Sequence, residues 1–239
     1  MNEYLERGYA VDYGRLIKAK KIELVLLDYL KSKKDNLSDK KIIDIGCGSG
    51  HIAAYFSERN SVWAVDVVDQ VSPDVKQKIN FIKIEKDLLQ FPGGEFDIAI
   101  LNHVLAHTED KLSLLMEVNR LLKNNGICYI ANPNRYYPIE PYYKIPFLHY
   151  FPQKLFLKLA VCLGKNKEDV YLVSHPSLKK LAEVAKFSVT DYTVNVINES
   201  EKYSSEYKIP FGIKLPQIVS IISPTNIYIL KSQDDKNGL

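Results

Sequence analysis

The stretch Lys41-Ile-Ile-Asp-Ile-Gly-Cys-Gly-Ser-Gly50 decides the fold. Its first half is apolar except for Asp44, which is typical of a buried strand in a parallel sheet. Its second half places Gly46, Gly48 and Gly50 at alternate positions. Glycine tolerates positive φ and carries no Cβ, so a ligand can lie against the backbone of such a turn. Apolar residues at helical spacing follow, so the turn leads into a helix N-terminus, a common ligand site in α/β sheets.

Two classes of ligand use a turn of this kind. The dinucleotide fingerprint G-x-G-x-x-G requires a third glycine where this chain has His51. The spacing G-x-G-x-G, with an acid two positions earlier, instead resembles the first motif of the class I S-adenosylmethionine (SAM)-dependent methyltransferases, D/E-x-G-x-G-x-G. A generic glycine-rich turn stays open as an alternative on this stretch alone. The resemblance implies that SAM is the cofactor and that the following residues bind it: Asp44, Gly46, Cys47, Gly48 and Gly50.

Length and composition indicate one globular domain. The chain has 239 residues, of which 46% are hydrophobic and 26% charged, and a formal net charge of +3. This small charge gives no indication of nucleic-acid binding. The cysteines, Cys47, Cys128 and Cys162, are widely spaced and odd in number, so neither a disulfide framework nor a metal site is expected. Because no signal peptide and no transmembrane-length apolar run is found, we expect a soluble cytoplasmic protein. The oligomeric state stays open.

Strand and helix patterns alternate along the chain. Residues 14–31 carry apolar residues near helical spacing, and Thr108 is expected to cap a helix with an apolar stripe that includes Met116. Strands are expected at 41–45, 61–66, 80–84, 96–102, 127–131, 188–197 and 226–230. This order predicts an α/β fold with a Rossmann-like, doubly wound sheet of seven strands. The methyltransferase resemblance implies that the sheet is mostly parallel and that its last strand is antiparallel.

The same resemblance implies a single methyltransferase domain over residues 1–239, divided into four parts. These parts are an N-terminal helical cap (1–37), a cofactor-binding half (38–131), a lid or insertion (132–175) and the C-terminal half of the sheet (176–231).

Further cofactor residues follow later strands. Asp66 lies about twenty residues after Gly46, where nucleotide-binding α/β proteins place a carboxylate on the ribose hydroxyls. The alternative is a solvated acid in a strand-end loop. In the methyltransferase resemblance, Asp87 meets the adenine amino group and Leu88 lies beside its ring. The remaining candidates are Val67, next to Asp66, and Asn102, at the carboxyl end of the expected central strand.

The segment Asn132–Pro152 is dense in proline and aromatic residues and has neither helical nor strand periodicity. Because long loops in compact domains are often functional, it is interpreted as a lid over the acceptor site. A loop that packs its aromatic side chains on its own core is the alternative. The apolar segment 209–224 is a second candidate flap, for which peripheral membrane contact stays open. The polar candidates for acceptor contact in the lid are Arg135, Tyr136, Glu140 and His149.

A catalytic base is expected after the central strand. Histidine has a suitable unperturbed pKa for proton transfer near neutrality, and His103 and His107 would share a face if this segment were helical. The resemblance favours His107, since many small-molecule members of the class carry a histidine in an L-x-H stretch, here Leu105-Ala-His107. The alternative is that His107 only fixes the turn through a backbone hydrogen bond. No metal is expected, because no third ligand stands at diagnostic spacing.

The sequence therefore predicts a SAM-dependent methyltransferase that acts on a small-molecule, lipid-linked or sugar acceptor. Base N-methyltransferases are disfavoured, because Asn102-His-Val-Leu stands where many of them have an N-P-P-Y-type tetrapeptide. Two other functions stay open. One is a SAM-binding regulatory protein without transfer activity. The other is a nucleotide-dependent oxidoreductase, against which His51 argues.

Overall fold

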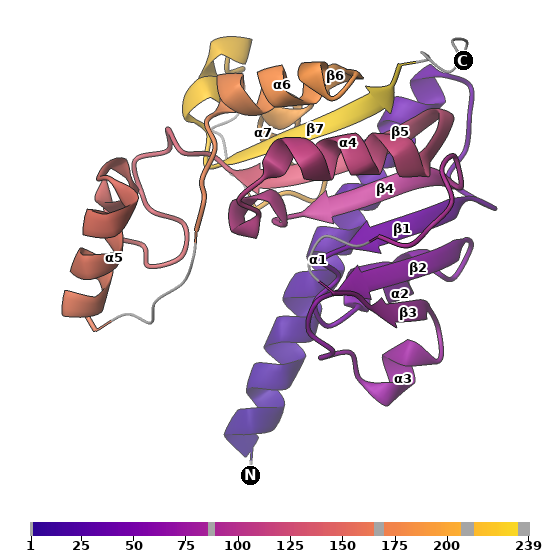
Figure 1. The fold of residues 1–239 in the computed structure, drawn as a ribbon, viewed down its shortest axis with the longest axis horizontal. Helices are drawn as coiled ribbons and strands as arrows, with labels where there is room; N and C mark the ends of the chain where they lie inside the picture. The colour runs from indigo at the N-terminus through magenta and orange to yellow at the C-terminus, as the bar shows by residue number, and fades with distance from the viewer. Residues whose placement is uncertain (1, 86–88, 165–169, 207–212, 234–239) are drawn as a thin grey trace.

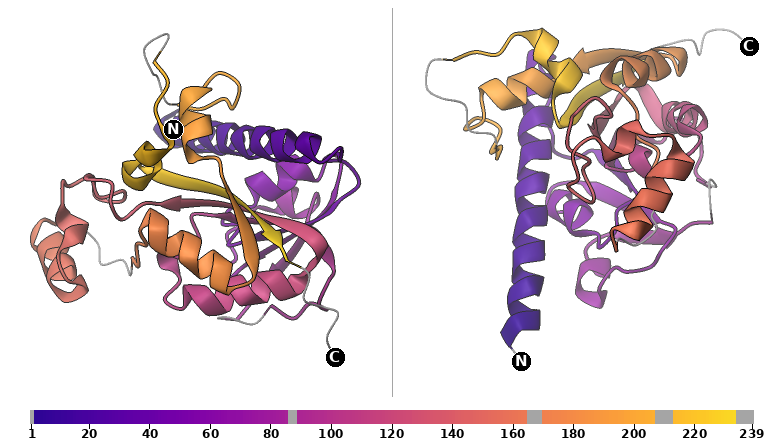
Figure 2. Two further views of the ribbon diagram at one scale, coloured as in Figure 1. Left: turned by 90° about the horizontal axis from the view of Figure 1, so that it is seen from above. Right: turned by 90° about the vertical axis from the view of Figure 1, so that its left-hand side faces the viewer.

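A computed structural model describes residues 2–85, 89–164, 170–206 and 213–233 of the chain. Within these residues, seven strands form one sheet with helices on both faces (Figures 1 and 2). The strands are β1 (Lys41–Ile45), β2 (Ser61–Asp66), β3 (Asn80–Lys83), β4 (Phe96–Asn102), β5 (Leu122–Pro133), β6 (Phe187–Asp191) and β7 (Thr225–Ser232).

The strand order is β3-β2-β1-β4-β5-β7-β6. Among the described strands, β7 alone runs antiparallel to its neighbours, β5 and β6. The predicted Rossmann-like sheet with an antiparallel last strand is thus confirmed. The chain builds outward from β1 to β3 and then resumes at β4 on the other side of β1, so the direction of winding reverses between β1 and β4. Open α/β sheets bind ligands at the carboxyl ends of their strands at such a reversal.

The helices are α1 (Asn2–Ser32), α2 (His51–Phe56), α3 (Pro73–Lys76), α4 (Lys111–Leu121), α5 (Gln153–Cys162), α6 (His175–Val184) and α7 (Thr193–Asn198). Short 3₁₀ helices are η1 (Leu105–His107), η2 (Leu148–Tyr150) and η3 (Gln217–Ile222). No described helix combines the length and the apolar character needed to cross a bilayer.

Alternating strand residues form two hydrophobic cores. Side chains such as Ile42, Ile98 and Tyr129 pack with α1, α2 and α7, whereas Ile43 and Leu101 face the side covered by α4 and α6. Seen from above, α1 lies on one side of the sheet and α4 and α6 lie on the other (Figure 2). Because both faces are covered, the central strands are apolar almost throughout, as the sequence indicated.

The expected strand over 188–197 is wrong in its second half. β6 ends at Asp191, whose carboxylate Oδ1 accepts a hydrogen bond from the backbone N–H of Thr193 at 2.8 Å and starts α7. The Thr193 hydroxyl oxygen in turn accepts from the N–H of Ile227 at 3.0 Å. The β-branched residues of this stretch favour a strand by propensity, but these tertiary hydrogen bonds turn the chain out of the sheet.

The start and the buried face of α4 also differ from expectation. The helix is capped by Asp110, whose carboxylate accepts from the N–H of Ser113 at 3.0 Å. Thr108, the expected cap, donates its hydroxyl to the carbonyl of Val104 instead. Met116, placed in the apolar stripe by the sequence, is exposed, because the buried face of the helix runs through Leu115, Val118 and Leu121.

The lid segment forms a lobe beside the sheet, with α5 at its outer end (Figure 1). Leu148, Phe156 and Ala160 give this lobe a small core of its own. Its two ends meet at the sheet, because Asn134 and Val173 form a bridge and the N–H of Arg135 donates to the carbonyl of Val173 at 3.1 Å. The division of the chain into four parts, with the lid at 132–175, stays a prediction.

Candidate active site

The glycine turn after β1 adopts a backbone that favours glycine at each of its three alternate positions. The φ values of Gly46, Gly48 and Gly50 are 68°, 56° and 77°. At Gly46 a Cβ would also lie 2.7 Å from Cγ2 of Val104, closer than carbon atoms approach without displacement. The backbone N–H of Gly46 donates to the carbonyl of Val65 at 2.8 Å, which fixes the turn to β2. The turn therefore packs against the segment that follows β4, at the carboxyl edge of the sheet.

Asp66 closes this turn from the neighbouring strand. Its carboxylate accepts from the N–H of Gly48 at 2.8 Å and from the N–H of Val68 at 3.0 Å. A carboxylate has about four lone-pair sites, so two hydrogen bonds leave it able to accept from ribose hydroxyls. Val67, beside it, is half exposed. Asp87 and Leu88, the expected adenine residues, lie outside the described residues.

Two buried polar atoms of opposite character lie beside the turn without hydrogen-bond partners. Asp44 is 2% exposed, and its Oδ2 has no partner within the described residues. Burial, reinforced by the charge of Asp66, raises the pKa of Asp44 to about 7. Arg15, on α1, places its guanidinium 3.5 Å from the position of a Cβ on Gly48. The Nε of Arg15 is buried and likewise lacks a partner in the described part of the chain.

This arrangement fits SAM. The methionyl part of SAM carries one ammonium and one carboxylate, which match the unpartnered oxygen of Asp44 and the guanidinium of Arg15. Arg15 could not be predicted from the sequence, because no local pattern on α1 indicates which of its basic residues reaches the glycine turn. Cys47 is buried, and burial raises the pKa of its thiol, so the side chain contributes packing rather than a thiolate.

Asn102 and two histidines follow at the end of β4. Asn102 ends the strand at the carboxyl edge. His103 has a φ of 67°, and its N–H donates to the carbonyl of Ala131 at 2.7 Å. The segment is therefore not helical at this residue, so the condition under which His103 and His107 would share a helix face is not met. Helical geometry begins only at η1, which ends with an exposed His107.

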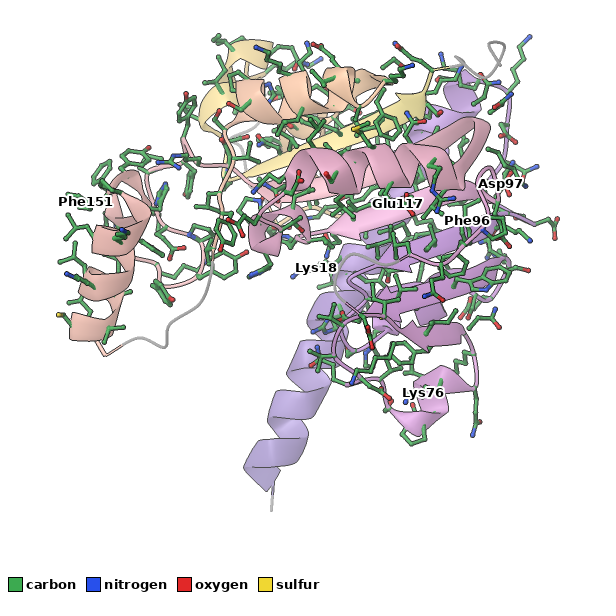
Figure 3. The ribbon with its side chains drawn as sticks, in the orientation of Figure 1. Lys18, Lys76, Phe96, Asp97, Glu117 and Phe151 are labelled. Carbon is green, nitrogen blue, oxygen red and sulfur yellow. The ribbon has the colours of Figure 1, made fainter. Side chains whose placement is uncertain are left out.

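The surroundings separate the two histidines as candidate bases. Burial, together with the positive charges of Lys18 and Lys21, lowers the pKa of His103 to about 4. Lys18 lies on α1 near the carboxyl ends of the central strands, whereas Asp97 marks their opposite ends (Figure 3). A group with so low a pKa is a weak base near neutrality, so His107 is the better candidate of the pair. Within the described residues, no cluster of three metal-ligating side chains is found.

Among the described residues of the lid, Tyr142 and Tyr171 contact η1, which follows β4. The hydroxyl of Tyr142 lies 3.1 Å from Nε2 of His107, and the two rings meet edge to face with centroids 5.2 Å apart. The N–H of Tyr171 donates to the carbonyl of Ala106 at 2.7 Å. The role of Tyr142 could not be predicted from the sequence, because nothing in its local pattern distinguishes it from the other aromatic residues of the lid.

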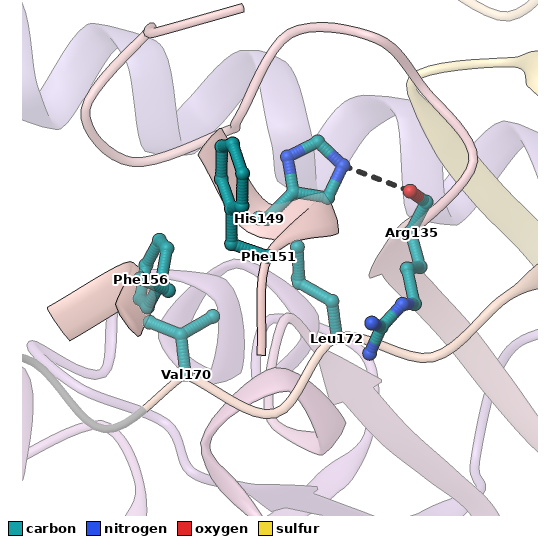
Figure 4. A pocket seen from close by; sticks show the side chains of 6 residues that line it. All are labelled: Arg135, His149, Phe151, Phe156, Val170 and Leu172. Atoms are coloured by element: carbon teal, nitrogen blue, oxygen red, sulfur yellow. Dashed lines mark hydrogen bonds between the residues drawn. The ribbon is translucent and has the colours of Figure 1, made fainter. Parts of the chain in front are cut away.

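A cavity of about 70 Å³ lies within the lid lobe (Figure 4). It is lined by Arg135, His149, Phe151, Phe156, Val170 and Leu172. Nε2 of His149 lies 2.8 Å from the carbonyl oxygen of Arg135, so this nitrogen carries the proton and donates it. The Nδ1 of His149 is buried with no partner among the described residues, and burial lowers the pKa of the imidazole. Within the described residues, the guanidinium of Arg135 has no ion-pair partner.

The other two acceptor candidates lie elsewhere. Tyr136 is 45% exposed and does not line the cavity. Glu140 is fully buried, and its carboxylate accepts hydrogen bonds from the backbone N–H groups of Tyr142 and Tyr143. The position of Glu140 therefore disagrees with a role in acceptor contact, because its carboxylate is buried and hydrogen-bonded to the backbone of the lid.

Comparison with known proteins shows what the chain resembles. A sequence profile for a methyltransferase domain matches residues 14–192. The ubiquinone biosynthesis O-methyltransferase of Rickettsia bellii is 26% identical over 133 residues, which are 52% of this chain and 55% of that protein. The corresponding Pseudomonas aeruginosa enzyme is 27% identical over 113 residues, 43% of this chain and 48% of that protein. The chain spans about half the length of these curated relatives.

Solved structures share the fold at low sequence identity. A SAM-dependent methyltransferase from Mesorhizobium loti superposes with a TM-score of 0.57 at 14% identity, over 85% of this chain and 96% of that one. Magnesium protoporphyrin IX methyltransferase from Synechocystis PCC 6803 with bound SAH gives a TM-score of 0.53 at 14% identity, over 92% and 84% of the two chains.

The raised pKa of Asp44 predicts a pH-dependent cost in stability. Between pH 4 and pH 7 the folded state retains a proton that the unfolded state loses, so stability falls as pH rises through this window. Asp44→Asn removes this dependence and should be more stable than wild type by on the order of 3 kcal/mol at pH 8. The gain should shrink toward zero near pH 4. Urea denaturation of both proteins at pH 4.5 and pH 8 measures it. A stability difference that is the same at both pH values would contradict the expectation.

Arg15 predicts a loss of SAM affinity on substitution. Removing one side of a charge-assisted hydrogen bond costs about 1.5–3 kcal/mol, so Arg15→Gln should weaken SAM binding by about 10- to 100-fold. Isothermal titration calorimetry with SAM measures the change. The matched control is Lys20→Gln, on the same helix, because Lys20 pairs with Glu23 away from the turn. Equal affinities for the two variants would exclude Arg15 from the site.

Proposed function

The chain belongs to the methyltransferase-domain family, and from this premise we propose that it transfers the methyl group of SAM to a hydroxyl of a small apolar molecule, with His107 as the base. The family membership supports the predicted SAM-dependent methyltransferase. The identity of the acceptor and the role of each residue belong to the proposal.

One observation carries the choice of a hydroxyl acceptor. An exposed imidazole, His107, stands at the carboxyl edge of β4 with a phenol hydroxyl 3.1 Å from its Nε2. Val104, three residues earlier, contacts the glycine turn. A hydroxyl must lose its proton as it gains a methyl group, and an imidazole within hydrogen-bond reach is suited to receive it. The names of the relatives, which describe O-methyltransferases, support the same assignment.

The bound SAM supplies a methyl group that is activated by its sulfonium. The residues of the chain would hold SAM and the acceptor in position for the transfer. Asp44 and Arg15 would hold the methionyl charges, Asp66 would hold the ribose, and the glycine turn would let both approach the backbone. The lid would exclude water, and His107 would take the proton. Holding an acceptor in line with a reactive group and away from water supplies much of the rate in such reactions.

The cavity in the lid favours an apolar acceptor over a sugar. Phe151, Phe156, Val170 and Leu172 supply four of its six lining side chains. Tyr171, between Val170 and Leu172, is hydrogen-bonded to Ala106, which directly precedes His107. An acceptor hydroxyl at His107 would therefore place the apolar remainder of the molecule toward this cavity. Lipid-linked acceptors fit the same reasoning.

Peripheral membrane contact stays a prediction. The sequence leaves this contact open for segment 209–224, of which residues 209–212 lie outside the described residues. Ile213, Ile218 and Ile222 in the described part are more than half exposed. Exposed apolar side chains of this kind support such a contact.

The function is tested by His107→Gln. Glutamine keeps a polar contact but cannot take the proton, so methyl transfer from SAM to catechol, used as a small aromatic hydroxyl probe, should fall by about 100-fold or more. The affinity for SAM and the melting temperature should not change. Undiminished turnover across pH 6–9 would rule out His107 as the base. A wild-type chain that binds SAM but methylates no hydroxyl probe would support the regulatory alternative.

The acceptor position is tested at Phe151. Phe151→Ala removes one wall of the cavity, so KM for catechol should rise by about 10-fold with SAM affinity unchanged. Phe147→Ala is the matched control, because Phe147 lies on the same lobe, has a similar exposed fraction (54% against 46%) and does not line the cavity. Equal effects of the two variants on KM would mean that the cavity is not an acceptor site.

A further inference from the structure

We propose that Tyr142 is a second catalytic residue, whose phenol hydroxyl receives the proton of the acceptor hydroxyl and passes its own proton to Nε2 of His107. The inference rests on the proposed function. The observation that carries it is the 3.1 Å contact between the phenol oxygen and the imidazole nitrogen, made across 35 positions of sequence between the lid and η1.

The direction of this hydrogen bond follows from the chemistry of the two groups. A neutral imidazole has one nitrogen that donates and one that accepts, whereas a phenol can do either. The phenol O–H is a stronger hydrogen-bond donor than the N–H of a neutral imidazole. The imidazole nitrogen is a strong acceptor. Tyr142 therefore donates to Nε2 of His107, and the imidazole proton resides on Nδ1.

This assignment decides how a proton reaches His107. The Nε2 lone pair, which would act as the base, is already engaged by the proton of Tyr142. While this hydrogen bond is kept, a proton from the acceptor hydroxyl can reach Nε2 only through the phenol oxygen, which would take one proton as it gives up its own. How firmly Tyr142 is held decides whether it relays the proton or is displaced by the acceptor.

The buried carboxylate of Glu140 fixes the backbone at Tyr142. The carboxylate of Glu140, which is 0% exposed, accepts from the N–H groups of Tyr142 and Tyr143. The N–H of Glu140 donates to the carbonyl of Ile145 at 3.1 Å, and the N–H of Lys144 donates to the carbonyl of Glu140 at 3.0 Å. Charge-assisted hydrogen bonds are about twice as strong as neutral ones. Hydrogen bonds within residues 140–145 therefore hold this turn of the lid in one conformation.

The neighbouring ring adds to this support. Tyr143 stacks on Phe156 of α5 with centroids 5.9 Å apart, which anchors the turn in the core of the lid lobe. The edge-to-face contact between Tyr142 and His107 orients the phenol from the other side. Because these contacts hold Tyr142 in place, displacing it would be costly for the acceptor. We therefore expect Tyr142 to stay in position and relay the proton.

The relay conserves both protons and charge. As the bond between the acceptor oxygen and the methyl carbon forms, the O–H bond of the acceptor breaks and its proton moves to the oxygen of Tyr142. The phenol proton moves to Nε2 of His107 in the same step, so Tyr142 ends neutral and His107 ends as the imidazolium. The positive charge lost by the sulfonium is thus retained on His107. Because His107 is exposed, it returns this proton to water.

The first experiment requires no acceptor. ¹⁵N NMR of histidine-labelled protein above pH 8 distinguishes the two neutral tautomers of His107. Wild type should show the Nδ1–H form, and Tyr142→Phe, which keeps the ring but lacks the donor, should show the tautomer mixture of an exposed histidine. An Nε2–H form in wild type would overturn the relay, whatever the activity.

The second experiment measures methyl transfer from SAM to catechol. Tyr142→Phe should lower kcat by about 100-fold, as is typical of losing a proton-transfer group, with KM and SAM affinity within twofold of wild type. The double variant Tyr142→Phe/His107→Gln should be no slower than the slower single variant, because residues that act as a unit are not additive. Tyr150→Phe is the matched control, since the Tyr150 hydroxyl bonds the carbonyl of Tyr136 within the lid.

Failure of the relay is distinguishable from failure of the proposed function. If Tyr142→Phe keeps full kcat or lowers KM while His107→Gln is slow, Tyr142 is a bystander or a plug, and the relay is overturned while His107 stays the base. If both variants turn over like wild type, the base assignment fails as well. If the two losses multiply in the double variant, the residues act independently, which also overturns the relay.

Discussion

The close approach of Gly46 to Val104 is the constraint on which the rest of the site depends. With 2.7 Å between a Cβ position and Cγ2 of Val104, a larger residue at position 46 would displace Val104 or move the turn after β1 away from the turn after β4. The first turn would hold the cofactor, and the second turn carries His107. Their contact sets the distance between the proposed cofactor site and the proposed base, His107. Steric fit at one glycine therefore links the two.

Two carboxylates and one guanidinium lie close together at the carboxyl edge of the sheet. Asp44 and Asp66 repel each other beside the glycine turn, and the guanidinium of Arg15, on α1, lies next to Gly48 of the same turn. Such a site is unfavourable when empty, because a buried carboxyl with an unpartnered oxygen loses solvation without full compensation. A ligand that brings one ammonium and one carboxylate relieves both deficits. We infer that part of the binding energy for SAM is stored in this way in the folded chain.

Much of the fold was readable from the sequence, because its signals are local. The apolar runs of β1, β2 and β4 and the spacing of the glycines depend on neighbours in the chain. The errors arose where distant contacts decide. Residues 193–197 look like a strand by propensity. They form α7 instead, because Thr193 donates its N–H to the carboxylate of Asp191 and its hydroxyl oxygen accepts from the N–H of Ile227. Arg15 and Tyr142 reach the site from segments whose own sequence shows nothing unusual, so their positions required the tertiary structure.

The two ends of the lid meet at one bridge, between Asn134 and Val173. The cost of closing a loop grows only slowly with its length, by about 0.6 kcal/mol for each doubling. Residues between these two points can therefore be added, removed or exchanged while the ends stay joined and the sheet stays intact. The lobe also buries its own small core, so it behaves as a replaceable module. In evolutionary terms, such a chain could acquire a new acceptor by rewriting this one segment while its cofactor site stayed constant.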